Sequence, residues 1–292
     1  MIVYKYVKLD GLDIIENLRI KVSNPKDFND PFEFIPSVLD VPLKQADDMV
    51  FNNEEYLKRL YDYAISIDQT NKSFELFVEE IRSSNGRVRI LESLLIVAES
   101  LRIKCEELKA KSDEMILVSC FSGEDIERSQ EVLMWSHYTD GHKGLRIAFD
   151  TDVLNIEGSS FEEIKYQANR VQLNPIDHFI GNRTRFEDVF NEVIVSKASN
   201  WSYERECRWL VPSNKCQRYK KNSFVYINPK AIVEVVCGQR CSLKQILLIK
   251  SLVRSKLSNE VKVKRSEIDA YEFKLDRARL IEVLEMTLKE GE

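Results

Sequence analysis

One block of the chain, residues 42–112, differs in pattern from the segments on either side of it. Apolar residues recur there at helical spacing, and the block contains a single glycine, Gly86. Strand-like runs of β-branched and aromatic residues flank it, as in residues 1–8 (MIVYKYVK) and 115–121 (MILVSCF). The chain is therefore predicted to have a core domain, residues 1–41 and 113–292, with a helical insertion at 42–112 that acts as a cap or an interaction surface.

The other strand-like runs are separated by helical segments at irregular intervals. Residues 144–150 (GLRIAFD) alternate and predict a half-buried strand, residues 129–139 predict a short helix stopped by Gly141, and residues 203–211 predict a late strand. A terminal helix is expected over 280–289. This mixture favours an α+β fold with a mixed, mostly antiparallel sheet over a doubly wound parallel one.

The charge balance points away from nucleic acid and membranes. The chain has 43 Lys and Arg against 48 Asp and Glu, so its formal net charge is −5. Nucleic acid is therefore disfavoured as a partner. No apolar run reaches the roughly 18 residues of a membrane helix. The first residues form a strand-like run instead of a signal peptide, and we expect a cytoplasmic protein without a membrane partner.

The cysteines and the familiar short motifs exclude several classes of site. None of the six cysteines belongs to a CxxC pair, and buried thiols of a reduced compartment explain them best. Cys237 and Cys241 lack a second ligand pair, so no metal site is predicted. The sequence contains no GxGxxG, GxxxxGK[ST], GxSxG or HExxH, which disfavours Rossmann, P-loop, α/β-hydrolase and zincin sites.

The stretch WSYERECRW is the most informative about chemistry. On a strand, its Glu204, Glu206 and Arg208 would share one face. Arg208 would keep Glu206 ionised, while repulsion would raise the pKa of one carboxylate. Such a pair can stabilise a cationic transition state or act as a base. An ordinary surface ion pair is the alternative, but the flanking aromatic residues, Trp201 among them, favour a cleft.

The stretch LMWSHYTDGHKG supplies a second group of candidates. Trp135 and Tyr138 are three residues apart, so they share a helix face and form an aromatic wall. His137 and His142 are five apart, which is a poor chelate, and each alone favours packing or hydrogen bonding. Together with Lys143, these side chains could hold an anionic or aromatic ligand.

Two further segments carry candidate residues with ordinary structural alternatives. Asn29 and Asp30 in FNDPFE suit a ligand contact or an Asx-turn. Tyr4 and Lys5 lie in the first strand, where a lone lysine among aromatic residues often extends its amino group to solvent. Lys197, just ahead of the glutamates, is equally ambiguous.

Read together, five motifs resemble a bacterial family known as domain of unknown function 2971. They are YKY near the start, FNDPFE, the CFS of residues 120–122, LMWSHYTDGHKGLRIAFD and K-x3-WSYERECR. The resemblance covers residues 1–36 and 114–240. The helical block carries none of its motifs.

The layout is also similar, more distantly, to ADP-ribosyltransferase-type folds, which bind NAD in a split antiparallel sheet. The site of those folds has three parts. They are an early strand, a middle strand or helix, and a late Glu-x-Glu, which commonly lies in a loop before its strand. The resemblance implies Lys5 with Tyr4 or Tyr6 in the first place, Tyr138 with Trp135 in the second, and Glu204-Arg205-Glu206 in the third.

The same resemblance implies roles for these residues. Glu206 would stabilise the oxocarbenium-like ribose and bond its 2′-hydroxyl, while Glu204 would position an acceptor or water. Tyr138 and Trp135 would stack on nicotinamide, and Lys5 or Arg208 would meet the pyrophosphate. The predicted catalytic residues are Glu206, Glu204 and Tyr138, and the predicted cofactor-binding residues are Lys5, Tyr4, Asn29, Asp30, Trp135, His137, His142, Lys143, Trp201 and Arg208.

We therefore expect an NAD-consuming enzyme, an ADP-ribosyltransferase or NAD glycohydrolase, that takes a nucleotide-like substrate and serves as a bacterial toxin or phage-defence effector. A non-catalytic sensor that binds a protein partner through the helical insertion is the first alternative. The second is a metal-dependent nuclease that uses acidic residues and one lysine: Asp30, Glu33, Glu204, Glu206 and Lys197.

Overall fold

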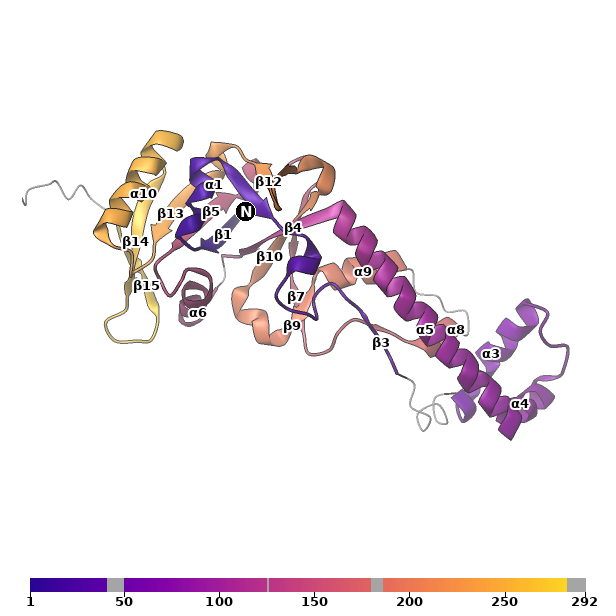
Figure 1. Ribbon diagram of the computed structural model, residues 1–292. Helices are drawn as coiled ribbons and strands as arrows, with labels where there is room; N and C mark the ends of the chain where they lie inside the picture. Colours follow the sequence, from indigo (N-terminus) through magenta and orange to yellow (C-terminus); the bar gives the residue numbers. More distant parts are fainter. Residues whose placement is uncertain (41–49, 125, 180–185, 283–292) are drawn as a thin grey trace, which may run out of the picture. The chain divides into compact units, whose positions relative to one another are not determined.

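The computed structural model describes residues 1–40, 50–124, 126–179 and 186–282 (Figure 1). The contacts divide the chain into two compact units. The first consists of Met1–Pro31, Asp113–Ala168 and Lys197–Glu292, and the second of Phe32–Ser112 and Asn169–Ser196. The second unit thus includes residues 169–196, which the sequence analysis assigned to the core. Within the described residues, no helix combines the length and apolar character needed to cross a membrane.

An eight-stranded sheet organises the first unit. In spatial order its strands are β15 (Leu275–Glu282), β14 (Lys262–Ile268), β13 (Ile232–Cys237), β5 (Leu145–Asp150), β1 (Ile2–Val7), β4 (Ile116–Ser122), β10 (Glu206–Pro212) and β6 (Ser160–Glu163). The pair β13–β14 is parallel, and the other neighbours are antiparallel. The predicted α+β class with a mixed, mostly antiparallel sheet is confirmed.

Helices cover both faces of this sheet around β5. Helices α1 (Asp13–Glu16) and α10 (Leu243–Lys256) pack on one face of β5 and β13, in the main hydrophobic core. Helix α6 (Arg128–Tyr138) lies on the opposite face (Figure 1). It packs there through Met134 and Trp135. A short helix, α7 (Thr151–Leu154), follows β5 directly.

Strand β5 is therefore buried on both faces, and the prediction of a half-buried strand was wrong. Its alternation came from Arg146, which is buried instead of solvated. The Arg146 guanidinium donates to Glu131 Oε1 at 2.8 Å and to Glu234 Oε1 at 2.9 Å. An arginine held between two carboxylates can occupy an interior position that a polar sequence pattern assigns to the surface.

The loop that joins α6 to β5 is fixed by two glycines. Helix α6 ends at Tyr138, and the first left-handed residue after it is Asp140, with a φ of 53°; Gly141, the predicted stop, follows with a φ of 62°. A Cβ atom on Gly144 would lie 2.0 Å from the carbonyl oxygen of Val7, and only glycine allows this close approach to β1. The contact of Gly144 with Val7 fixes where this loop lies against β1.

A three-stranded sheet adjoins the main one. It consists of β11 (Gln217–Tyr219), β12 (Asn222–Tyr226) and β2 (Arg19–Val22). A bridge between Ser23 and Val118 links the end of β2 to β4. Strands β7 (Lys165–Gln167) and β9 (Ser196–Ala198) form a further pair.

The second unit is mainly helical. Its elements are β3 (Ser37–Val38), α3 (Glu54–Ser66), α4 (Phe74–Arg82), most of α5 (Ser84–Met115), β8 (Gln172–Leu173), α8 (Pro175–Phe179) and α9 (Phe186–Ile194). Two apolar clusters hold it together, around Leu57 and Leu94 and around Leu101 and Val189. The helical character predicted for 42–112 is present in the described part, residues 50–112. Residues 42–49 lie outside it.

The end of the described chain differs from the expectation. Residues 280–282 belong to β15, which pairs with β14, so the predicted terminal helix is wrong there, and residues 283–289 lie outside the described part. Pairing with a neighbouring strand satisfies the backbone polar groups of this stretch. The prediction failed because it used only the local spacing of apolar residues, which carries no information about a partner strand.

We predict that Trp209→Ala lowers the free energy of unfolding by about 3–5 kcal/mol, because it removes a fully buried indole from the main core. The ring stacks on Phe161 at a centroid distance of 5.7 Å, and its N–H donates to Ser159 Oγ at 3.0 Å. Urea denaturation followed by circular dichroism measures the change. The exposed Leu248 of α10 provides the control, and a Leu248→Ala loss of similar size would contradict the prediction.

Candidate functional site

Two buried glutamates share one lysine at the beginning of β10. The Lys197 ammonium donates to Glu204 Oε2 at 2.7 Å and to Glu206 Oε2 at 2.6 Å. Both glutamates are 4% exposed. Two carboxylates this close would repel each other strongly in a buried setting, so the ammonium between them stabilises the arrangement. This cluster is the candidate site.

The backbone brings the two glutamates together by a turn and not by strand alternation. Residues Ser199–Glu204 form a 3-10 turn, Arg205 has a left-handed φ of 44°, and β10 begins only at Glu206. The predicted strand over 203–211 therefore starts too early, and the argument from alternating faces was wrong for Glu204. A non-glycine residue in this conformation needs support from its surroundings. The Arg205 carbonyl accepts from Gly123 N–H at 2.8 Å.

Each glutamate has a second partner from another part of the fold. Arg208 Nε donates to Glu206 Oε1 at 2.7 Å, and Arg208 is fully buried. The Tyr138 hydroxyl, at the end of α6, donates to Glu204 Oε1. All four carboxylate oxygens therefore accept a hydrogen bond from a named side chain, which gives the cluster one defined geometry.

The two carboxyl groups have different proton affinities. Burial disfavours the charge of Glu206, but Arg208 and Lys197 outweigh it and lower the pKa of Glu206 to about 2. Burial raises the pKa of Glu204 above its ordinary value, although Lys197 and Tyr138 oppose the shift. A permanently ionised carboxylate beside one that exchanges protons more readily is a suitable arrangement for acid–base chemistry.

A cavity of about 300 Å³ adjoins this cluster. Its lining includes Glu206, Arg205, Tyr166 and Glu163, together with Met1, Gly123, Glu124, Ile164 and Cys207. The Tyr166 phenol oxygen accepts the Glu206 backbone N–H at 2.7 Å. Burial raises the pKa of Tyr166, so its hydroxyl keeps its proton at neutral pH. We call this space the Glu206 cavity.

Two other predicted residues join the cluster. Trp201 Nε1 donates to Asp30 Oδ2 at 3.0 Å. Lys197 Nζ lies 5.2 Å from the centroid of the Trp201 ring, within the range of a cation–π contact. The structure thus connects Asp30, Trp201 and the shared lysine, although they are far apart in the sequence. Asn29, beside Asp30, is exposed.

Trp135 does not belong to a ligand-facing wall, and its predicted role in binding is corrected. Its indole is 1% exposed, packs on Tyr6 at a centroid distance of 5.5 Å, and donates to Glu131 Oε1 at 3.3 Å. No face of the ring is left for a nicotinamide. The spacing did place Trp135 and Tyr138 in one cluster, but burial makes the tryptophan a core residue.

The remaining α6 candidates have local partners. His137 Nδ1 lies 3.1 Å from the Tyr203 hydroxyl, and His142 Nε2 lies 3.2 Å from Ser136 Oγ. Lys143 is exposed and lies 3.6 Å from Asp140. None of these contacts involves the two glutamates.

The first-strand candidates lie elsewhere. Tyr4 stacks under the Arg146 guanidinium at 4.7 Å. Lys5 lines a different cavity and donates to Ser119 Oγ and to the Cys120 carbonyl. The single site predicted from the sequence is therefore divided between the Glu206 cavity and a second cavity.

Sequence reasoning missed three contributors to the cluster. Lys197 was named only as an ambiguous residue and in the nuclease alternative, although it lies seven and nine residues before the glutamates that it joins. Arg205 was seen only as the residue between the glutamates, and Tyr166 carried no signal because it reaches the site from β7. Among the residues that the structure describes, no group of three or more His, Cys, Asp and Glu side chains could hold a metal ion.

Comparison with known proteins supplies one match, over the segment that carries the cluster. Residues 134–209 match the model of a family described as "Protein of unknown function (DUF2971)". Tyr138, Lys197, Glu204, Glu206 and Arg208 all fall within the DUF2971 match. The resemblance found from sequence motifs is confirmed over these residues. No curated protein and no solved structure matches the chain.

The interaction-module hypothesis stays a prediction. On α5, Leu95 and Ile96 are 65% and 68% exposed. The nuclease hypothesis also stays a prediction, and its two late glutamates already share the Lys197 ammonium at the place where a bridging cation would lie.

We predict that Glu206 makes the protein less stable in acid. Its pKa of about 2 lies below the ordinary 4.5, so the unfolded chain binds more protons between these values. Acidification from pH 5 to pH 3 should therefore remove about 2 kcal/mol of the free energy of unfolding through this group. Urea denaturation at several pH values measures the slope. The slope of the free energy of unfolding against pH should become shallower in Glu206→Gln. It should stay unchanged in the control Glu16→Gln, which changes an exposed glutamate. Equal slopes in all three proteins would contradict the prediction.

Proposed function

We propose that this protein consumes NAD by breaking the N-glycosidic bond between nicotinamide and ribose, and transfers ADP-ribose to water or to another acceptor. The observation that carries the proposal is the ionised Glu206, which is held by Arg208 and Lys197 at the edge of a cavity of about 300 Å³. A fixed negative charge in a buried site stabilises the positive charge that develops on the ribose.

The reaction assigns a separate task to each glutamate. The bond between ribose C1′ and the nicotinamide nitrogen breaks, and its electron pair returns to the pyridine ring. Glu206 faces the oxocarbenium-like ribose and stabilises it, as carboxylates do in glycoside cleavage. Water or another hydroxyl then attacks C1′, and its proton passes to Glu204, whose raised pKa suits it to accept one. Tyr138 holds Glu204 in place through its hydrogen bond.

Substrate binding relies on residues around the Glu206 cavity. Arg205 lines it and can pair with the pyrophosphate, and the Tyr166 hydroxyl can bond to a ribose hydroxyl. Arg205 thus takes the role at the pyrophosphate that the sequence suggested for Lys5 or Arg208, and Tyr166 adds a contact to the ribose. Arg208 acts indirectly, because it is fully buried and keeps Glu206 charged.

The backbone of the cluster supports the likeness to ADP-ribosyltransferase-type folds. In that superfamily the Glu-x-Glu commonly lies in a loop before its strand. Here Glu204 belongs to the 3-10 turn that precedes β10, and Glu206 is the first residue of the strand. The DUF2971 match itself names no activity. Depletion of NAD harms the cell that contains the enzyme. We therefore propose that the protein acts as a toxin or phage-defence effector.

The test is release of nicotinamide from NAD by the purified protein, followed by liquid chromatography. We expect Glu206→Gln to lower the rate by at least about 100-fold, because the charge opposite the developing cation is lost. Glu204→Gln should lower it less with water as acceptor, and the exposed Glu16→Gln provides the matched control. Circular dichroism confirms that each variant is folded. The proposal would be overturned if Glu206→Gln released nicotinamide at the wild-type rate. It would also be overturned if neither the wild type nor any variant released nicotinamide from NAD.

A further inference from the structure

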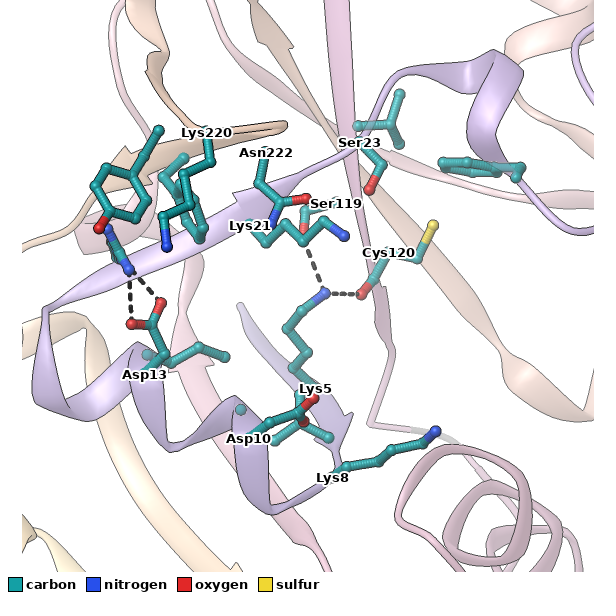
Figure 2. A pocket seen from close by; sticks show the side chains of 18 residues that line it. Lys5, Lys8, Asp10, Asp13, Lys21, Ser23, Ser119, Cys120, Lys220 and Asn222 are labelled. Atoms are coloured by element: carbon teal, nitrogen blue, oxygen red, sulfur yellow. Dashed lines mark hydrogen bonds and ion pairs between the residues drawn. The ribbon is translucent and has the colours of Figure 1, made fainter.

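A second cavity, of about 690 Å³, lies between β1, β4 and the three-stranded sheet (Figure 2). This volume falls within the range of about 300–1,000 Å³ that is usual for small-molecule sites. Side chains from β1, β2, β4 and the β11–β12 hairpin line it, and none of its lining residues also lines the Glu206 cavity. We call it the lysine cavity.

The lysine cavity forms where two neighbouring strands separate. Strand β1 pairs with β5 along its whole length, from Ile2 to Val7, whereas its register with β4 is the pair Tyr4–Ser122. Next to that pair, the Lys5 ammonium bonds to β4 at a position where β1 does not pair with it. It donates to the Cys120 carbonyl at 2.8 Å and to Ser119 Oγ at 2.9 Å, both on β4. The lysine thereby satisfies backbone that β1 leaves unpaired.

The charge inside the cavity is positive. Arg19 and Asp13 neutralise each other through two hydrogen bonds of 2.8 Å. The other charged side chains of the lining are four lysines against one aspartate: Lys5, Lys8, Lys21 and Lys220 against Asp10. Such an excess of cations in a concave space concentrates anions there.

Lys5 is half-buried, whereas the other three lysines are exposed, and it retains binding capacity. An ammonium has three N–H donors, and two of them are used on Ser119 and Cys120. Among the described residues, no acceptor takes the third. Burial lowers the pKa of Lys5, Cys120 and Glu206 oppose the shift, and the nearby Lys21 adds to it, so that the pKa is about 8. An anion placed beside Lys5 and Lys21 would relieve both effects.

Neutral groups in the lining suit a phosphorylated organic molecule. Asn222, Ser23 and Ser119 can bond to phosphate oxygens or to polar ligand atoms, and Figure 2 shows them around the ends of Lys5 and Lys21. Aromatic rings, including Phe28 and Tyr219, supply apolar surface. Lysine binds phosphate as a point charge and does not need the paired geometry of arginine.

We propose that the lysine cavity binds a small molecule with two or more linked phosphates, such as a nucleoside diphosphate, through Lys5 and Lys21. This site goes beyond the proposed cleavage of NAD, because it uses no residue of the Glu206 cavity. The two linked phosphates match the two adjacent ammonium groups, while Lys8 and Lys220, which are exposed, attract the ligand from the rim.

Isothermal titration calorimetry of the full chain tests the proposal with pyrophosphate, ADP and adenosine. We expect pyrophosphate and ADP to bind and adenosine, which lacks phosphate, not to bind. Lys21→Glu reverses an exposed charge and should weaken binding by about 10-fold or more. Lys5→Met should weaken it by about 30-fold, because a buried charge-assisted hydrogen bond is lost. The matched control is Lys244→Met, an exposed lysine of α10 that does not line the cavity.

The pH dependence gives a readout that a folding defect cannot imitate. Wild-type affinity for pyrophosphate should fall as the pH rises through about 8, because Lys5 loses its proton there. Lys21→Glu keeps Lys5 but removes a cation that lowers its pKa, so affinity should fall in the same direction, from a lower starting value and at a higher pH. No binding of pyrophosphate or ADP, equal binding of adenosine, or unchanged affinity in Lys21→Glu would overturn the proposal. Nicotinamide release is measured separately, so either proposal can fail without the other.

Discussion

The Lys197 ammonium between Glu204 and Glu206 is the interaction on which the candidate site depends. Two carboxylates cannot both be buried and ionised at one place without a cation, since burial and mutual repulsion each disfavour the charge. The Lys197 ammonium supplies that cation. Glu204, in the turn before β10, and Glu206, at the start of the strand, can therefore both be buried. Arg208 adds a second cation, which is why the network leaves one glutamate ionised and the other closer to protonation.

The surrounding fold holds this cluster through elements that are distant in sequence. Tyr138 reaches it from α6, and the contact of Gly144 with Val7 fixes the loop after that helix against β1. Tyr166 reaches it from β7 and Asp30 from the segment after β2. Because all four carboxylate oxygens have a side-chain partner, the cluster has one defined geometry beside a cavity, and such preorganised groups favour electrostatic catalysis.

The first unit uses buried and half-buried cations in three different ways. Arg146 is enclosed by Glu131 and Glu234 and serves the core. Lys197 holds two acidic groups at the edge of the Glu206 cavity. Lys5 has only neutral acceptors, a hydroxyl and a carbonyl, and therefore keeps a net positive charge for a ligand. Whether a buried cation belongs to packing or to binding depends on how completely its partners neutralise it.

The sequence by itself determined the fold class and the helical character of the inserted block, and it singled out the Glu204–Glu206 segment as a candidate site, because these depend on local periodicity and residue type. Only the tertiary structure decided which side chains meet. Trp135 became core, Lys5 moved to a cavity of its own, and Lys197 joined the glutamates. Pairing across the sheet, burial and the left-handed turn at Arg205 set those distances, and none of them leaves a signature in the spacing of neighbouring residues.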